Sequence, residues 1–118
     1  METELYNAQI ITNILYSLTS LVFIIIGFIQ LKFPPKEINP LYGYRSKQAK
    51  SSEKKWHFAQ QYSAKWMIWI GIVLLATCLP FFFLAISPLV LTISYISEMF
   101  LLMALMMVFT ERKLKGIS

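Results

Sequence analysis

The fold class of this chain is decided by the apolar run IITNILYSLTSLVFIIIGFIQL, residues 10–31. A helix of this length crosses the hydrocarbon core of a bilayer, which is about 30 Å thick. Two further apolar runs cover residues 66–85 and 89–109. In lipid each run must be helical, because only a helix pairs all of its backbone amides within one segment. The sequence therefore predicts one all-α membrane domain, residues 1–118, with three transmembrane helices.

The composition supports a membrane protein. Charged residues make up 14% of the 118 residues, against about a quarter in an average soluble domain. The segment before the first run, METELYNAQ, is acidic, whereas a signal peptide begins with basic residues, so we expect a permanent helix there. The net charge of +5 requires no nucleic acid, because a polybasic segment also attracts anionic membrane lipids.

The distribution of charge orients the three helices. All eleven basic residues lie either in the connection of residues 32–65 or after residue 109. Cytoplasmic loops carry the excess of lysine and arginine in membrane proteins. We therefore expect a cytoplasmic loop over residues 32–65, a cytoplasmic C-terminus and an N-terminus on the outer side.

The loop divides into two parts. Three prolines and Gly43 prevent a continuous helix over residues 33–43, whereas no helix breaker occurs between Ser52 and Gly71. Ser51 or Ser52 is a suitable N-cap, and Glu53 then lies in the first turn. The second span should therefore begin with a cytoplasmic helical extension. Farther along, Pro80 predicts a kink near Thr77, and Pro88 marks the turn into the third span.

An ordered set of residues spans this loop and the extension. A Gly-Tyr-Arg-Ser element is followed by a spacer with serine and glutamate, a tryptophan and small residues that lead into the second span. This set resembles the SdpI-type family, which is named for immunity to the sporulation-delaying protein toxin, in a short three-span form. The resemblance covers about residues 39–70, and Ser46 stands where the family pattern has threonine. Its residues are Asn39, Gly43, Tyr44, Arg45, Ser46, Glu53 and Trp56.

The resemblance implies a multi-pass protein of the bacterial cytoplasmic membrane. In the best understood relatives the protein protects the cell from a secreted, membrane-active peptide toxin. One relative also holds a transcriptional repressor at the membrane. The partners that the resemblance implies are a peptide toxin and a transcriptional repressor, beside membrane lipids, with no direct contact to nucleic acid. A homodimer is left open.

Two residues of the element invite a physical interpretation. Gly43 is expected to supply a positive φ, or a close approach that a side chain would block. The guanidinium of Arg45 could pair with a carboxylate, with a lipid phosphate or with the carbonyls at a helix end. Both structural anchoring and ligand binding remain open for Arg45.

Glu98 lies near the middle of the third span, where a charged carboxylate costs about 2.5–3.5 kcal/mol on insertion scales. Such a side chain must be neutral, paired or hydrated. Polar residues of the first span recur at helical spacing, and Ser94 lies four residues before Glu98. The sequence therefore predicts a polar cluster open to the outer side, with Glu98 at its floor. The candidate ligand-binding residues are Asn13, Ser17, Ser20, Ser94, Tyr95, Glu98 and, on the inner side, Arg45.

Three functions fit these residues. The favoured one is a non-enzymatic immunity or receptor protein. The alternatives are a membrane-embedded hydrolase acting on a peptide or lipid, with Glu98 as the acid or base, and a small proton-linked transporter that uses Glu98 as a relay. No catalytic residue, metal ligand or cofactor is assigned, because His57 is the only histidine and Cys78 the only cysteine.

Overall fold

The computed structural model describes residues 2–117 and contains three long helices. They are α1 (Glu2–Lys32), α2 (Glu53–Cys78) and α3 (Pro88–Lys115), with the short 3₁₀ helices η1 (Ala49–Ser51) and η2 (Leu79–Phe82). The described residues contain no strand. All three long helices are long and apolar enough to cross a membrane. The prediction of an all-α fold with three membrane-spanning helices is confirmed.

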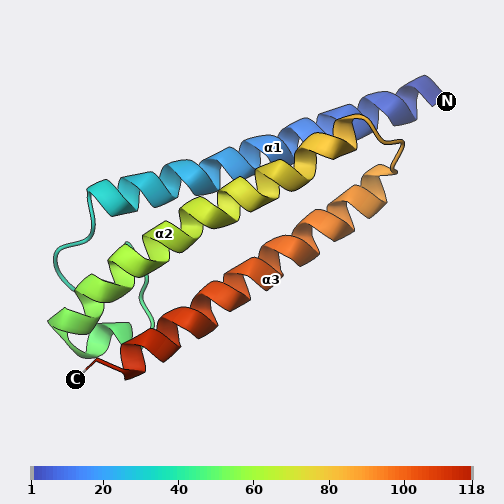
Figure 1. Ribbon diagram of the computed structural model, residues 1–118. Coiled ribbons are helices and arrows are strands. Elements are labelled where there is room, and N and C mark those ends of the chain that lie inside the picture. The colour runs from blue at the N-terminus through green and yellow to red at the C-terminus, as the bar shows by residue number, and fades with distance from the viewer. Residues whose placement is uncertain (1, 118) are drawn as a thin grey trace.

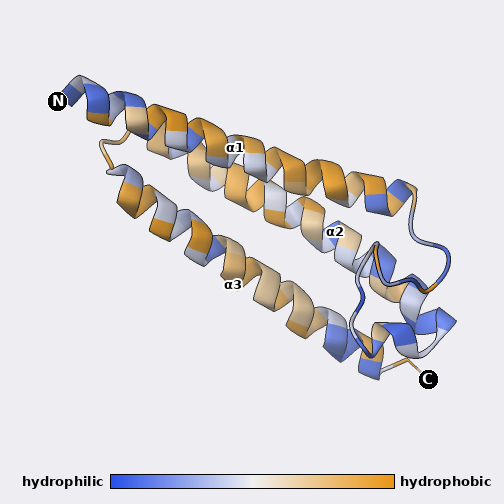
Figure 2. Cartoon of the chain, turned by 180° about the vertical axis from the view of Figure 1, so that it is seen from behind, coloured by the Kyte–Doolittle hydropathy of each residue, from blue (hydrophilic) through white to orange (hydrophobic). Residues whose placement is uncertain are grey.

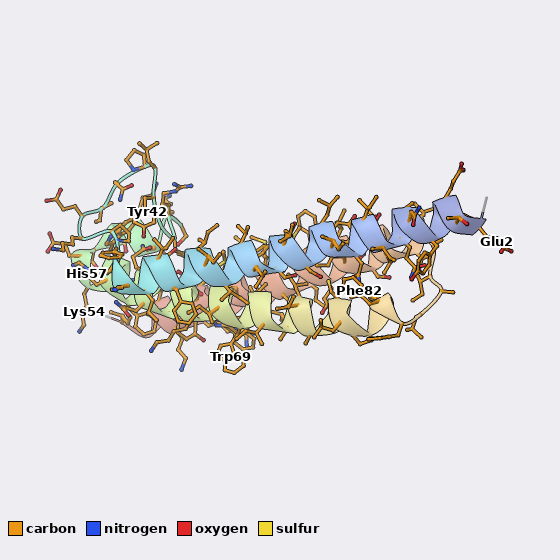
Figure 3. All side chains as sticks on the ribbon, turned by 90° about the horizontal axis from the view of Figure 1, so that it is seen from above. Glu2, Tyr42, Lys54, His57, Trp69 and Phe82 are labelled. Carbon is orange, nitrogen blue, oxygen red and sulfur yellow. The ribbon has the colours of Figure 1, made fainter. Side chains whose placement is uncertain are left out.

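The helices form an elongated bundle of 59 × 24 × 21 Å, in which α1 and α2 lie side by side and α3 runs along them (Figure 1). The N-terminal end of α1 lies at one end of the bundle. The loop between α1 and α2 lies at the opposite end, together with the chain's C-terminal end. Apolar residues cover the middle of each helix, and hydrophilic residues gather at the loop end (Figure 2). Glu2 lies at one end of the bundle, and the loop residue Tyr42 lies at the other, beside Lys54 and His57 of the first turns of α2 (Figure 3).

The contact between α1 and α2 depends on one glycine from each helix. A Cβ atom at Gly71 would lie 2.7 Å from the carbonyl oxygen of Ser20, and one at Gly27 would lie 2.9 Å from that of Ala64. Real Cβ atoms do not approach backbone oxygens so closely. The two glycines therefore let the backbones of α1 and α2 come into direct contact, as small residues do at helix interfaces in membranes.

The helix ends follow the capping residues in the sequence. Ser52 caps α2 by accepting a hydrogen bond from the Lys55 amide at 3.1 Å, which confirms the predicted N-cap. Ser87 caps α3 in the same way by accepting from the Val90 amide at 3.2 Å, and Pro88 is the first residue of that helix. Each serine thus satisfies one of the backbone amides that the first turn of a helix leaves without an intrahelical partner.

Within the predicted second span, the α-helix gives way to a 3₁₀ helix around Pro80. Helix α2 stops at Cys78 and passes into η2, rather than continuing through a kink to Ala85. Pro80 lacks an amide hydrogen and crowds the preceding turn, so the tighter 3₁₀ geometry replaces the α-helix there. The other two helices are longer than their apolar runs. Helix α1 begins at Glu2, before its run, and α3 continues past its run to Lys115.

Candidate functional site

Two tyrosines join α1 to α3 inside the apolar part of the bundle. The Tyr16 hydroxyl donates to Thr92 Oγ1 at 2.6 Å, and the hydroxyls of Tyr95 and Ser20 lie 2.9 Å apart. The rings of Tyr16 and Tyr95 stack with centroids 4.5 Å apart. The Ser20 hydroxyl uses its hydrogen to donate to the Tyr16 carbonyl at 2.8 Å, so its oxygen accepts the hydrogen bond from the Tyr95 hydroxyl. The hydroxyls therefore satisfy one another within the bundle.

Asn13 connects α1 to the end of α2. Its Nδ2 donates to the Cys78 carbonyl at 3.1 Å, at the point where α2 passes into η2. Its Oδ1 has no hydrogen-bond partner within the described residues, although the side chain is only 1% exposed. A buried acceptor without a partner costs about 1–3 kcal/mol. Asn13 therefore retains an unused acceptor inside the bundle.

Glu98 joins α3 to α2. The Thr77 hydroxyl donates to Glu98 Oε1 at 2.8 Å and also lies 2.9 Å from the Val73 carbonyl. One hydroxyl hydrogen serves only one of these acceptors at a time. A protonated Glu98 would donate to Thr77 while Thr77 donates to Val73, so that both hydrogen bonds could form together. The half-buried carboxyl is thus held by a single side chain.

These residues form what we call the membrane cluster. It lies among the three helices and consists of Asn13, Tyr16, Ser20, Thr77, Cys78, Thr92, Tyr95 and Glu98.

The structure brings together part of the set that the sequence singles out. Asn13 and Ser20 are buried, and Ser17 is half-buried and donates to the Asn13 carbonyl at 2.8 Å. Ser94 is exposed and lies outside the cluster. Asn13, Ser20 and Tyr95 are 1%, 0% and 6% exposed, so this part of the cluster is closed rather than open to the outer side as predicted.

A second polar group holds the loop against α2. The Gln60 side chain accepts from the Tyr44 amide at 2.7 Å and donates to the Tyr44 carbonyl at 2.8 Å. Gln30 on α1 donates to the Gln60 carbonyl and to Ser63 Oγ, both at 3.0 Å. Gln60 is completely buried. We call this arrangement the Gln60 clamp, and it fixes the loop backbone at one residue of the Gly-Tyr-Arg-Ser element.

Gly43 is the residue that makes the clamp fit. Its φ is +95°, a conformation that favours glycine. A Cβ at this position would also collide with Gln60 Oε1 and lie 2.7 Å from Pro35 Cγ. Both expectations for Gly43, a positive φ and a close approach, are confirmed.

Three more residues of the ordered set that the sequence singles out, Trp56, Asn39 and Ser46, hold the loop at further points. Trp56 is completely buried and donates from Nε1 to the Pro35 carbonyl at 2.7 Å. Asn39 Oδ1 accepts from the Tyr42 amide at 2.7 Å. Ser46 Oγ accepts from the Ala49 amide at 3.1 Å. Glu53 and Arg45 are exposed.

Tyr44 also connects the loop to α3. Its hydroxyl donates to Glu111 Oε1 at 2.8 Å, and Gln48 Nε2 donates to the Glu111 carbonyl at 2.9 Å. Burial raises the pKa of Tyr44 above its ordinary value of 10.0, and the neighbouring Glu111 carboxylate raises it further. The phenol therefore stays protonated and remains a donor at neutral pH.

Neither group resembles a metal site or a hydrolytic dyad. No cluster of three or more His, Cys, Asp and Glu side chains suited to a metal ion occurs within residues 2–117. Glu98 contacts a threonine, and Ser94 lies exposed at a separate position. The chemistry that the membrane cluster offers is hydrogen bonding and, at Glu98, a carboxyl group able to receive a cation or a donor.

Sequence reasoning missed Gln30, Gln60, Tyr16 and Thr92. The two glutamines carry no recognisable motif, and glutamine beside a polar loop is usually solvated. Tyr16 and Ser20 are spaced as i and i+4, which was a usable signal, because such residues share a helix face.

A profile of the SdpI/YfhL protein family matches residues 36–110 of the chain. A protein of Bacillus subtilis (strain 168), described as "Uncharacterized protein YfhL", is 43% identical over 53 residues. This match covers 45% of the chain and 48% of the relative, so it spans about half the length of each. No solved structure matches the chain. The matched family segment contains the Gly-Tyr-Arg-Ser element, Gln60 and Glu98.

Proposed function

Because the chain belongs to the SdpI/YfhL protein family, we propose that it is a multi-pass bacterial membrane protein that protects its cell from a secreted, membrane-active peptide. The peptide would enter from the outer leaflet and bind at the membrane cluster. The observation that supports this proposal is the polar character of the cluster, which includes an unused buried acceptor at Asn13 and a half-buried carboxyl at Glu98. Intramembrane ionisable groups of this kind commonly serve function.

The proposed binding step exchanges internal partners for peptide partners. A backbone amide or lysine of the peptide would donate to Asn13 Oδ1 or to the Glu98 carboxyl. Such contacts are favourable where the alternative is an unpaired group in an apolar medium. Asn13 is buried, so the helices must separate slightly before it can be reached.

Helix α3 offers a route from this event to the inner side. It carries both Glu98 in the membrane cluster and Glu111, which accepts the Tyr44 hydroxyl. A displacement of α3 by the peptide would therefore alter the contact with the Gly-Tyr-Arg-Ser element. A repressor that binds one of the two loop states better than the other could read this change.

Survival of a sensitive bacterium tests the proposal. Secreted peptides are collected from a strain that carries the gene for this chain and are added to the sensitive bacterium. Expression of the chain should raise the survival of that bacterium, and the peptides should be recovered intact. Glu98→Ala and Asn13→Leu should each reduce this protection, whereas the control Ser94→Ala, at an exposed position, should retain it. Cleaved peptide would favour a hydrolase instead. Proton-linked flux in liposomes that Glu98→Gln abolishes would favour a transporter.

The proposed orientation has its own test. In a Cys78→Ser background, Ala85→Cys should react with an impermeant thiol reagent in intact cells. Lys47→Cys should react only after the cells are opened. The reverse pattern would contradict entry of the peptide from the side of the 83–87 turn.

A further inference from the structure

The C-terminal part of α3 carries a groove with an apolar floor and a basic rim. Two adjoining hollows of about 380 and 320 Å³ meet at Met107. The first is bordered by the Gly-Tyr-Arg-Ser element, and the second by the last turns of α3. We call them together the α3 groove. Its lining residues include Arg45, Met107, Val108, Glu111, Arg112 and Lys115.

Arg45 is brought to this groove by the fixed backbone before it. The Gln60 clamp holds both backbone groups of Tyr44, and the Tyr44 hydroxyl is bonded to Glu111 on α3. Gly43 supplies the positive φ that this path requires. Arg45 follows directly, and its side chain is exposed. The element therefore presents a guanidinium beside α3 from a backbone that has little freedom.

The charge of the groove is positive. Arg45, Arg112 and Lys115 are exposed, and within residues 2–117 none of them forms an ion pair. The one acidic residue of the groove, Glu111, accepts the Tyr44 hydroxyl through Oε1. Three exposed basic side chains thus line the two hollows, and the one carboxylate among the lining residues is already engaged.

The floor of the groove is apolar. Met107 and Val108 are 53% and 48% exposed, and they belong to the last part of the apolar run of α3. A soluble anion would leave these side chains uncovered. A ligand that satisfies both the floor and the rim must combine an acyl chain with a negative headgroup.

We propose that the α3 groove is a specific binding site for an anionic phospholipid, with its phosphate on Arg45 and Arg112 and its acyl chain on Met107 and Val108. Arginine suits this role because its planar guanidinium donates two parallel hydrogen bonds to a phosphate. The site differs from general attraction of a basic loop to the membrane, because it depends on particular residues. The proposed lipid site does not depend on the proposed protection against a peptide.

A lipid titration of the purified full-length chain in detergent, followed by native mass spectrometry, tests this site. Phosphatidylglycerol should bind more tightly than zwitterionic phosphatidylethanolamine. Arg45→Gln should weaken the binding of phosphatidylglycerol about fivefold, and Arg45→Gln with Arg112→Gln on the order of 25-fold, from the usual contribution of one basic residue near an anionic surface. Inorganic phosphate should not displace the lipid, because it lacks the acyl chain.

Two variants serve as references. Lys36→Gln removes an exposed charge from a different hollow, at residues 32–42, and should leave lipid binding unchanged. Arg45→Lys retains the charge but loses the paired donors, so its affinity should fall between wild type and Arg45→Gln while its helical circular dichroism is retained. Equal affinity in wild type and the double variant would overturn the proposal. A preference of the groove for an acidic peptide over phosphatidylglycerol would overturn it as well.

Discussion

Tyr16 and Tyr95 stack with their ring planes 6° from parallel, and the hydroxyl of each is hydrogen-bonded to a residue on the other's helix. This reciprocal pairing joins α1 to α3 in the apolar part of the bundle. Few residues of these two helices touch elsewhere, so we expect the pair to stabilise the position of α3.

A double-mutant cycle between Tyr95→Phe and Ser20→Ala should therefore reveal a coupling of about 0.6 kcal/mol, the average for hydrogen bonds between membrane helices. The measurement is the free energy of unfolding in detergent. Ser94→Ala changes an exposed serine on the same helix and should leave stability unchanged. Strictly additive effects would show that the two hydroxyls do not interact.

Gly71→Ala should destabilise the contact of α1 with α2. The added methyl would meet the Ser20 carbonyl at 2.7 Å and the Ile24 amide nitrogen at 2.8 Å, so the backbones must separate. Overpacking of this kind costs about 1–3 kcal/mol. Gly116→Ala is the matched control, because its methyl would lie 3.5 Å from the Lys113 carbonyl oxygen. A thermal midpoint that falls equally in both variants would contradict the close crossing.

Gly43→Ala should open the Gln60 clamp. Alanine at a φ of +95° is strained, and its methyl collides with Gln60. A strained backbone position of this kind costs about 1–3 kcal/mol. We expect faster cleavage by trypsin at Arg45 and Lys47, measured on the folded protein in detergent. Gln60→Leu should produce the same cleavage pattern, and protection equal to wild type in both variants would argue against the clamp.

Tyr44 should make stability depend on pH in the alkaline range. Its pKa is raised in the folded state by burial and by Glu111, above the ordinary value of 10.0 that applies when the chain is unfolded. The folded state therefore holds this proton more tightly, and the contribution is complete below about pH 10 and is lost as the pH rises above it. In Tyr44→Phe the free energy of unfolding should lack this part of the loss at alkaline pH. Parallel pH profiles for the two proteins would contradict the shift.

The sequence was sufficient for the helices and for much of the loop. The length of the three apolar runs predicted the spans, Ser52 predicted the start of α2, and Gly43 predicted the positive φ. These features depend on local physics, namely the absence of water in the bilayer and the steric cost of a side chain. The inside and outside assignment rests on charge alone and stays a prediction.

The side-chain partners were harder to predict. Ser94 and Glu98 are four residues apart, yet Glu98 reaches Thr77 while Ser94 is exposed. Four residues turn an α-helix by about 40° beyond one full turn, which is enough to separate two residues at the edge of an interface. Gln60 depends on the loop folding back onto α2, a long-range event without a local signal.

The glycine crossing has a consequence for biosynthesis. The first two spans fit each other backbone to backbone, so they can associate as soon as the ribosome has delivered both to the bilayer. The third span follows them and is joined to α1 by the tyrosine, serine and threonine hydroxyls and to α2 by apolar and aromatic packing. We therefore expect newly made chains to mature in two stages, with the hairpin of α1 and α2 first and the docking of α3 afterwards.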